Sequence, residues 1–294
     1  MSQKKSAGLR RTQLRRTLAL LNVLGCVIFI AAITSPFWMK HAQTNRKGVM
    51  AEAKARSKME KDAWREPGQS VVERTGLPNL RAKLAAHAPV TVAFLGGSIT
   101  KNAGEGGFVN EIAKWIEAQA ADVHVETINA GIGNTGSDLG AQRIDADVLA
   151  HRPDVLFVEF AVNDGDRECT ADMEQIVRKT RQANPQTDIV FLYAVMDWTL
   201  PRLETGKFPP SVIRHEKVAA HYGIPTVALG YEAARKIRLG EWTWKNFSND
   251  ACHPTADGYA SYNRDLTTAL PLLLAVETSA PTSLPPPLVG NGEN

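Results

Sequence analysis

The feature that most limits the fold is a regular alternation of short apolar runs with longer amphipathic segments. The apolar runs have the length of strands buried on both faces, and the segments after them have the spacing of helices with one apolar side. Such alternation predicts an α/β fold in which helices cover both faces of a parallel sheet. The expected strands are 90–95, 123–128, 155–160, 189–195 and 226–229, and the expected helices are 106–120, 137–150, 170–184, 211–222 and 256–275.

The segment before this region favours a membrane anchor. No charged residue occurs between Arg16 and Lys40, and residues 18–39 are almost wholly apolar. As a helix this segment would reach about 33 Å, which is enough to cross a bilayer. The basic residues 1–17 before it predict a cytoplasmic N-terminus, with the bulk of the chain outside. A cleaved signal peptide is the alternative, although Ser-Pro-Phe-Trp at 35–38 is a poor cleavage site.

Composition divides the rest of the chain. Residues 40–68 are polar and rich in Ala, Lys and Glu, which predicts a stalk or linker, and 69–275 form the expected folded domain. The tail 276–294 is rich in Pro, Ser and Gly and is expected to be disordered. Outside 1–17 and 39–66 the chain has 20 Lys and Arg against 27 Asp and Glu, a net charge of −7. An acidic folded part argues against a nucleic-acid partner.

The cysteines exclude two classes of small domain. Cys26, Cys169 and Cys252 show no CxxC spacing, so neither a zinc ribbon nor a disulfide scaffold is expected. Cys169 and Cys252 could pair in an oxidising compartment, but unpaired thiols are the favoured interpretation. No set of His and Cys residues has the spacing of metal ligands, so we predict neither a metal nor a cofactor.

A serine stands at the end of the first expected strand. The run Val-Ala-Phe-Leu is followed by Gly96, Gly97 and Ser98. Ligands of open α/β sheets bind beyond the carboxyl ends of the strands, which makes Ser98 a candidate nucleophile. The alternative is a Gly-Gly-Ser turn without chemistry. The segment is neither a Walker A loop nor a G-x-S-x-G elbow.

Two more polar turns follow later strands. Residues 129–137 read Asn-Ala-Gly-Ile-Gly-Asn-Thr-Gly-Ser, whose glycines could expose backbone N–H groups at a helix entry. A dinucleotide site is a weak alternative there, because no acidic residue closes a following strand at the expected distance. Asn163 begins an Asn-Asp-Gly sequence and could aim its amide into the same cleft, unless this is only a turn.

An acid and an imidazole occur close together near the end of the domain. Asp250 and His253 are three residues apart, so their side chains can meet within one turn. The carboxylate would then fix the imidazole tautomer and leave the other nitrogen free as a base. A purely structural Asp–His cap is the alternative.

These four segments resemble, in order, the four sequence blocks of the SGNH/GDSL hydrolase superfamily over about residues 90–260. The first block is most similar to the bacterial branch in which it reads GGSIT. The resemblance implies a three-layer α/β/α, flavodoxin-like fold and a serine hydrolase, with Ser98 as nucleophile, His253 as general base and Asp250 as its orienting acid. It also implies an oxyanion hole made by the Ser98 N–H, a backbone N–H at Asn134 and the Asn163 side-chain amide.

The chain departs from the family pattern at two positions. Asn134 stands where the family has glycine, and Asn tolerates the left-handed backbone conformations that glycine favours. Ala161 stands where the family usually has glycine, which is a small change.

Aromatic residues near the blocks suggest a carbohydrate substrate. Trp198 follows the fourth expected strand, and Trp242 and Trp244 lead into Asp250. These rings could stack on sugar faces or serve only in packing. No long apolar lid for a lipid chain is evident, and the expected location is extracytoplasmic.

We therefore expect an esterase that removes O-acyl groups, most simply O-acetyl groups, from a carbohydrate or an exported polysaccharide. An O-acyltransferase acting on a polysaccharide and a lysophospholipase or thioesterase remain alternatives, and a noncatalytic glycan-binding protein is the least favoured. The expected location is a bacterial inner membrane, with a single span and the catalytic domain in the periplasm. The alternative is a periplasmic or secreted protein after signal cleavage.

Overall fold

The computed structural model describes residues 70–120, 122–200, 208–279 and 283–289. The predicted anchor at 18–39 lies outside them, and so do the basic N-terminus and the stalk that flank it. Within the described residues, no helix combines the length and the apolar character that a membrane span needs.

Six strands of the described chain form one sheet in the order β1-β6-β5-β4-β2-β3. Its strands are β1 (Val71–Val72), β2 (Val90–Gly96), β3 (Val125–Gly131), β4 (Val155–Glu159), β5 (Asp188–Tyr193) and β6 (Thr226–Ala228). Every residue of β4 and β5 is buried, as expected for strands that are covered on both faces.

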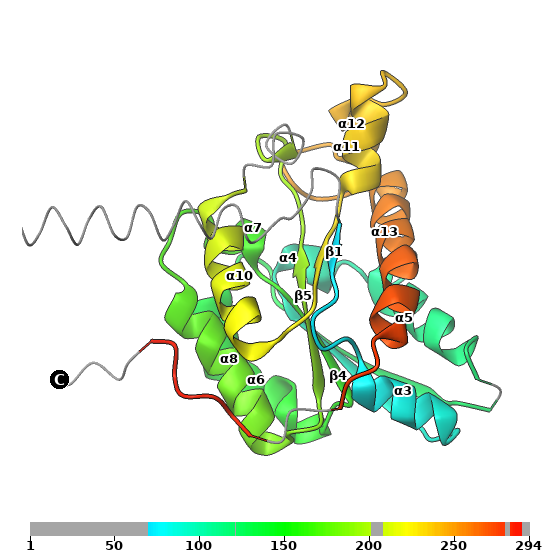
Figure 1. Ribbon diagram of the computed structural model, residues 1–294. Helices are drawn as coiled ribbons and strands as arrows, with labels where there is room; N and C mark the ends of the chain where they lie inside the picture. Colours follow the sequence, from blue (N-terminus) through cyan, green and yellow to red (C-terminus); the bar gives the residue numbers. More distant parts are fainter. Residues whose placement is uncertain (1–69, 121, 201–207, 280–282, 290–294) are drawn as a thin grey trace, which may run out of the picture. The chain divides into compact units, whose positions relative to one another are not determined.

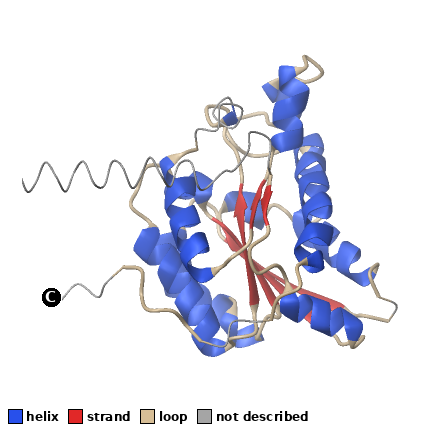
Figure 2. Ribbon diagram, in the orientation of Figure 1, coloured by secondary structure: helices blue, strands red, loops and turns tan. Residues whose placement is uncertain are grey.

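Helices cover both faces of this sheet (Figures 1 and 2). The layer that contains α6, α8 and α10 lies on one side, and α3, α5 and α13 lie on the other. The helices are α3 (Pro78–Ala85), α4 (Ser98–Lys101), α5 (Phe108–Glu117), α6 (Ser137–Asp147), α7 (Ala161–Asp164), α8 (Thr170–Ala183), α10 (Pro210–Tyr222), α11 (Tyr231–Arg238), α12 (Trp244–Phe247) and α13 (Ala256–Ala275), with a short 3₁₀ turn at Leu149–His151. Each helix and strand expected from the sequence is present within a few residues of its predicted bounds.

The sheet is mixed, so the prediction of a parallel sheet is wrong at one edge. β1 runs antiparallel to β6, with Val71 opposite Val227, while the other strands are parallel to their neighbours. An antiparallel edge strand needs no crossover helix, and β1 is only two residues long. Two valines before the first helix therefore leave no strand signal that the sequence pattern could reveal.

The strand order explains why the polar turns meet. β2 lies between β3 and β4. After β2 the chain therefore adds β3 on one side of it, and then adds β4 on its other side. This is the topological switch point, where the loops after adjacent strands diverge and leave a crevice beyond the carboxyl ends. Ser98 follows β2, Asn134 follows β3 and α7 follows β4, so all three lie at this edge.

Part of the expected disordered tail is described, and there it lies along α8. Arg178 donates to the Pro285 carbonyl at 2.9 Å, and the Val289 N–H donates to the Glu174 carboxylate at 2.8 Å. These contacts connect residues 283–289 to the helical layer beside the sheet (Figure 1).

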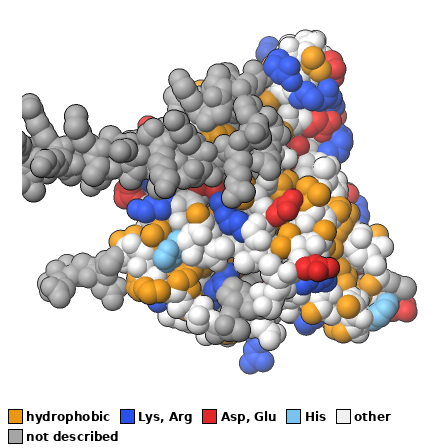
Figure 3. Space-filling view, in the orientation of Figure 1, with side chains coloured by type: hydrophobic (Ala, Val, Ile, Leu, Met, Phe, Trp, Pro, Cys, Tyr) orange, Lys and Arg blue, Asp and Glu red, His pale blue; other side chains and the backbone are white. Residues whose placement is uncertain are grey.

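Basic side chains gather over α11 and α12 on the face shown in Figure 3. The last turn of α11 contains Arg235, Lys236 and Arg238. Lys236 pairs with Glu232 at 3.2 Å and lies 4.3 Å from the centre of the Trp242 ring. One face of the Trp242 ring therefore makes a cation–π contact with Lys236.

Candidate active site

Ser98 is the first residue of α4, and a single residue, Gly97, separates it from β2. Gly96 and Gly97 allow the close packing around this turn. A Cβ on Gly96 would lie 2.1 Å from Thr100 Oγ1, and a Cβ on Gly97 would lie 2.1 Å from Asn163 Oδ1. Neither position can hold a larger residue without displacing its neighbour. The Gly-Gly-Ser sequence therefore reflects close packing around the serine as well as a tight turn.

Ser98, His253 and Asp250 form a continuous chain of hydrogen bonds. The Ser98 Oγ lies 2.8 Å from His253 Nε2, and His253 Nδ1 lies 2.8 Å from Asp250 Oδ2. The imidazole and the carboxylate come from the loop between α12 and α13, more than 150 residues after the serine. The structure thus brings together all three residues predicted for this role.

Local hydrogen bonds hold Asp250 in place. Its Oδ1 accepts the backbone N–H groups of Cys252 at 2.8 Å and His253 at 2.7 Å, so Oδ2 is left for the imidazole. These two backbone donors, followed by the His253 side chain, hold the pKa of Asp250 well below its usual range. An ionised Asp250 favours the tautomer with the proton on His253 Nδ1, which leaves His253 Nε2 facing the serine oxygen.

Two asparagines flank the serine. Asn163 lies in α7 with its Oδ1 packed against Gly97, and the described part of the chain offers its amide no hydrogen-bond partner. Asn134 has φ of 60°, the left-handed conformation that glycine favours and that Asn tolerates best among other residues. Its neighbour Gly133 passes close to Ser98, because a Cβ on that glycine would lie 3.9 Å from the serine Cβ. Both predicted oxyanion positions therefore lie in segments that contact the Gly97–Ser98 turn.

The tryptophans differ in their surroundings. Trp198 is 41% exposed in the loop after β5, and that loop contacts the loop between α12 and α13 through the Asp197 N–H, which donates to the Ala251 carbonyl at 3.0 Å. Trp244 donates its indole N–H to the Asp250 carbonyl at 2.5 Å and packs on Phe247. Trp244 thus supports the loop that holds Asp250. A substrate-binding role for the three tryptophans stays a prediction.

Both described cysteines are free thiols, so the considered pairing of Cys169 with Cys252 does not form. Cys169 is fully buried beside Asp164, and burial raises the pKa of its thiol. Cys252 Sγ lies 3.7 Å from His253 Nδ1. Cys26 lies outside the described residues.

Two clusters in the described chain place potential metal ligands close together. One contains Asp164, Cys169 and His215, and the other contains Asp250, Cys252 and His253. In both clusters the carboxylate is already hydrogen-bonded to the imidazole. We therefore assign no metal to either.

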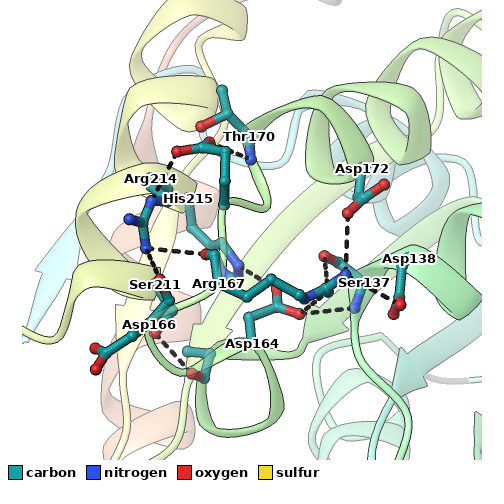
Figure 4. A network of polar contacts seen from close by, with 12 residues as sticks. Ser137, Asp138, Asp164, Asp166, Arg167, Thr170, Asp172, Ser211, Arg214 and His215 are labelled. Carbon is teal, nitrogen blue, oxygen red and sulfur yellow. Dashed lines mark hydrogen bonds and ion pairs between the residues drawn. The ribbon is translucent and has the colours of Figure 1, made fainter.

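Sequence reasoning missed the buried polar groups that support these turns. Asp164 follows Asn163 directly, and its carboxylate is bonded by Ser137, Arg167 and His215 (Figure 4). Desolvation raises the pKa of Asp164, but the hydrogen bond and charge of His215, together with the Ser137 N–H and Arg167, lower it to about 2. The Asn-Asp-Gly motif could have drawn attention to Asp164, but no sequence motif surrounds His215.

Glu159 is a second buried acid at this edge. It is the last residue of β4, pairs in register with Gly96, and accepts a hydrogen bond from Thr100 Oγ1 at 3.0 Å. Its Oε1 is buried without a partner in the described chain. Burial raises the pKa of Glu159 to about 8, the Thr100 bond opposes this rise, and the charge of Asp164 adds to it. Glu159 is therefore protonated at neutral pH.

We expect Glu159→Gln to make the protein relatively more stable at alkaline pH. Glu159 has an ordinary pKa near 4.5 when unfolded and about 8 when folded, so the unfolded state loses its proton first as pH rises. The free energy of unfolding should fall between about pH 5 and 8 and level off above that. Glutamine cannot ionise, so the free energy of unfolding of the variant should not fall in this way. Relative to the parent, it should rise by on the order of a few kcal/mol between about pH 5 and 8.

Urea denaturation at pH 5, 7 and 9 measures this difference. The exposed Glu117→Gln change in α5 is the control for losing one carboxyl group. A constant difference between Glu159→Gln and the parent across this range would show that Glu159 does not titrate as described.

Comparison with known proteins agrees with the geometry. Residues 94–261, more than half of the chain, match the model of the GDSL-like lipase/acylhydrolase family. No curated protein sequence matches the chain.

Among solved structures, a two-domain esterase active on acetylated mannans is similar, with 26% identity and a TM-score of 0.65 for its complex with mannopentaose. A second structure of this esterase gives a TM-score of 0.66. The matched region covers 76% of this chain but only 60% of the length of that esterase. An acetyl xylan esterase is a more distant match, with 18% identity and a TM-score of 0.49 over 61% of this chain and 98% of its own. The family match and the arrangement of the four blocks at one sheet edge show that the chain belongs to the GDSL-like lipase/acylhydrolase family, a family of ester hydrolases.

Proposed function

We propose that this protein is a serine esterase that removes O-acyl groups, most simply O-acetyl groups, from a carbohydrate. The observation that carries this proposal is the hydrogen-bonded series Ser98–His253–Asp250 at the carboxyl end of β2. The similarity to an esterase active on acetylated mannans supports the choice of substrate class.

The residues suggest a two-step reaction. His253 Nε2 takes the Ser98 proton as Oγ bonds to the acyl carbon, and the carbonyl oxygen becomes an oxyanion. The Ser98 N–H, the Asn134 N–H and the Asn163 amide would donate to that oxyanion. The sugar oxygen leaves with the proton from His253, and an acyl group stays on Ser98. Water then attacks this ester with His253 as base again, which releases the carboxylic acid and restores the serine.

Ester hydrolysis on a chain-length series tests the proposal. We expect p-nitrophenyl acetate to be cleaved at least about tenfold faster than the octanoate, because the proposed substrate carries an acetyl group and a site that fits this group closely would exclude a long chain. Acetylated mannan and acetylated xylan are then compared by acetate release. Faster cleavage of octanoate or of a lysophospholipid would contradict the proposal, and so would acetyl transfer to a sugar without release of acetate.

We also propose that residues 18–39 anchor the chain in a bacterial inner membrane, with Ser98 on the periplasmic side. The uncharged segment after a basic start supports this proposal. Cell fractionation with N-terminal sequencing tests it. Soluble mature protein that begins after residue 35 would indicate a cleaved signal peptide instead.

A further inference from the structure

A buried acid–imidazole pair lies outside the Ser98–His253–Asp250 series. His215 Nε2 of α10 lies 2.8 Å from Asp164 Oδ2 at the end of α7, and the two side chains are 1% and 0% exposed (Figure 4). Asp164 is the next residue after Asn163, the proposed side-chain donor of the oxyanion hole. A shift of this carboxylate therefore shifts the backbone that carries Asn163.

The other oxygen of this carboxylate binds the loop after β3. Asp164 Oδ1 accepts the Ser137 N–H at 2.9 Å and Arg167 Nη2 at 2.6 Å. Ser137 begins α6, three residues after Asn134, so this bond fixes the segment that holds the proposed backbone donor. The fit is close at Gly136, where a Cβ would lie 2.7 Å from Asp164 Oδ1. The Asp164 carboxylate thus bonds to Ser137, which ends the segment that contains Asn134, and Asp164 itself belongs to the segment that contains Asn163.

His215 is itself fixed from outside the site. Its ring packs against Phe191 and Tyr193 of β5, with ring centres 6.2 and 6.0 Å apart. At the start of α10, Ser211 Oγ donates to the Ala161 carbonyl at 2.7 Å, and the Ser211 N–H donates to the Gly165 carbonyl at 3.1 Å. Ser211 of α10 therefore bonds to the backbone at both ends of α7. His215 bonds to the Asp164 carboxylate at the end of α7 and packs against β5.

We propose that His215 and Asp164 are positioning residues that set the distance between the Asn134 N–H and the Asn163 amide in the oxyanion hole. The inference rests on the proposed function, because it assigns these donors to an oxyanion. Such donors act only within about 2.7–3.1 Å of the oxyanion, so a small displacement of either segment weakens transition-state binding. Neither positioning residue touches the reacting atoms.

A double-mutant cycle tests the pair. His215→Ala should lower kcat for p-nitrophenyl acetate about tenfold with KM within about twofold, because the donors matter most in the transition state. His215→Gln, whose amide can donate to Asp164 Oδ2, should recover most of this loss. In an Asn163→Ala background, His215→Ala should cost less than about threefold, since the distance that it sets, between the Asn134 N–H and the Asn163 amide, no longer exists.

The matched control is His221→Ala, a histidine on the same helix that bonds the Pro286 carbonyl instead. It should leave kcat unchanged in both backgrounds. If His215→Ala fails to fold, Gly136→Ala replaces it, because the added Cβ disturbs Asp164 from the loop side. An equal loss in both backgrounds, or no loss of kcat, would overturn the inference. Turnover by Ser98→Ala would instead overturn the proposed function. Failure of the proposed function and failure of this inference therefore give different results.

Discussion

Ser98→Ala is expected to lower kcat by at least about 10³-fold and to leave the fold intact. The serine oxygen lies 2.8 Å from His253 Nε2, so its loss removes the covalent route. The remaining donors and the binding site can supply only residual catalysis, as in other serine hydrolases. Rates on p-nitrophenyl acetate, with circular dichroism and thermal unfolding of each protein, measure the effect.

Ser283→Ala is the matched control for this change. Ser283 is an exposed serine of the described tail, and its loss should alter neither rate nor stability. Substantial ester cleavage by a folded Ser98→Ala variant would mean that another group attacks the ester, and the assignment of the nucleophile would then be wrong.

Asn163→Ala is expected to lower kcat by about 10²–10³-fold, whereas Asn134→Gly should stay within about tenfold of the parent. The first change removes a side-chain donor, and loss of one oxyanion donor has this effect in other enzymes. The second keeps the backbone N–H, and glycine accepts the left-handed φ of 60° found at Asn134 without strain. The contrast therefore separates a side-chain donor from a backbone donor.

Asn163→Asp sharpens this comparison. Aspartate keeps the shape that packs on Gly97 but cannot donate a hydrogen bond when ionised, so we expect it to be as slow as Asn163→Ala. If Asn163→Ala were nearly as active as the parent and Asn134→Gly were inactive, the two asparagines would have exchanged roles. The side chain of Asn134 would then be the donor.

The local parts of this protein could be predicted from its sequence. Strands buried on both faces leave uninterrupted apolar runs, so β2, β4, β5 and β6 were expected close to their observed bounds. The prediction of a buried strand at 123–128 is wrong in its burial, because β3 lies at the sheet edge and leaves Glu126 and Asn129 exposed. Asp250 and His253 lie three residues apart, and their contact depends on a single turn. The order of the polar turns along the chain, together with the family resemblance, predicts Ser98 as the nucleophile without any tertiary contact.

The supporting groups could not be predicted, because they depend on which distant segments meet. β1 pairs with β6 across more than 150 residues, and two valines carry no periodic signal. The sequence showed Trp244 as an aromatic near the site, and only the fold shows its indole bonded to the Asp250 carbonyl. Burial of Glu159, and with it the rise of its pKa, depends on tertiary packing at the end of β4, where Thr100 of α4 contacts its carboxyl group.

The pairing of Asp164 with His215 shows the same limit. The two residues are 51 positions apart, and each taken alone resembles an ordinary turn acid or helix histidine. Periodicity and short motifs report only what neighbours in the chain require of one another. Which buried charge meets which imidazole is decided by the packing of α7, α10 and the start of α6 against the sheet. The layers and the reactive groups therefore follow from patterns along the chain, whereas the contacts that hold those groups in place follow from the packing of distant segments.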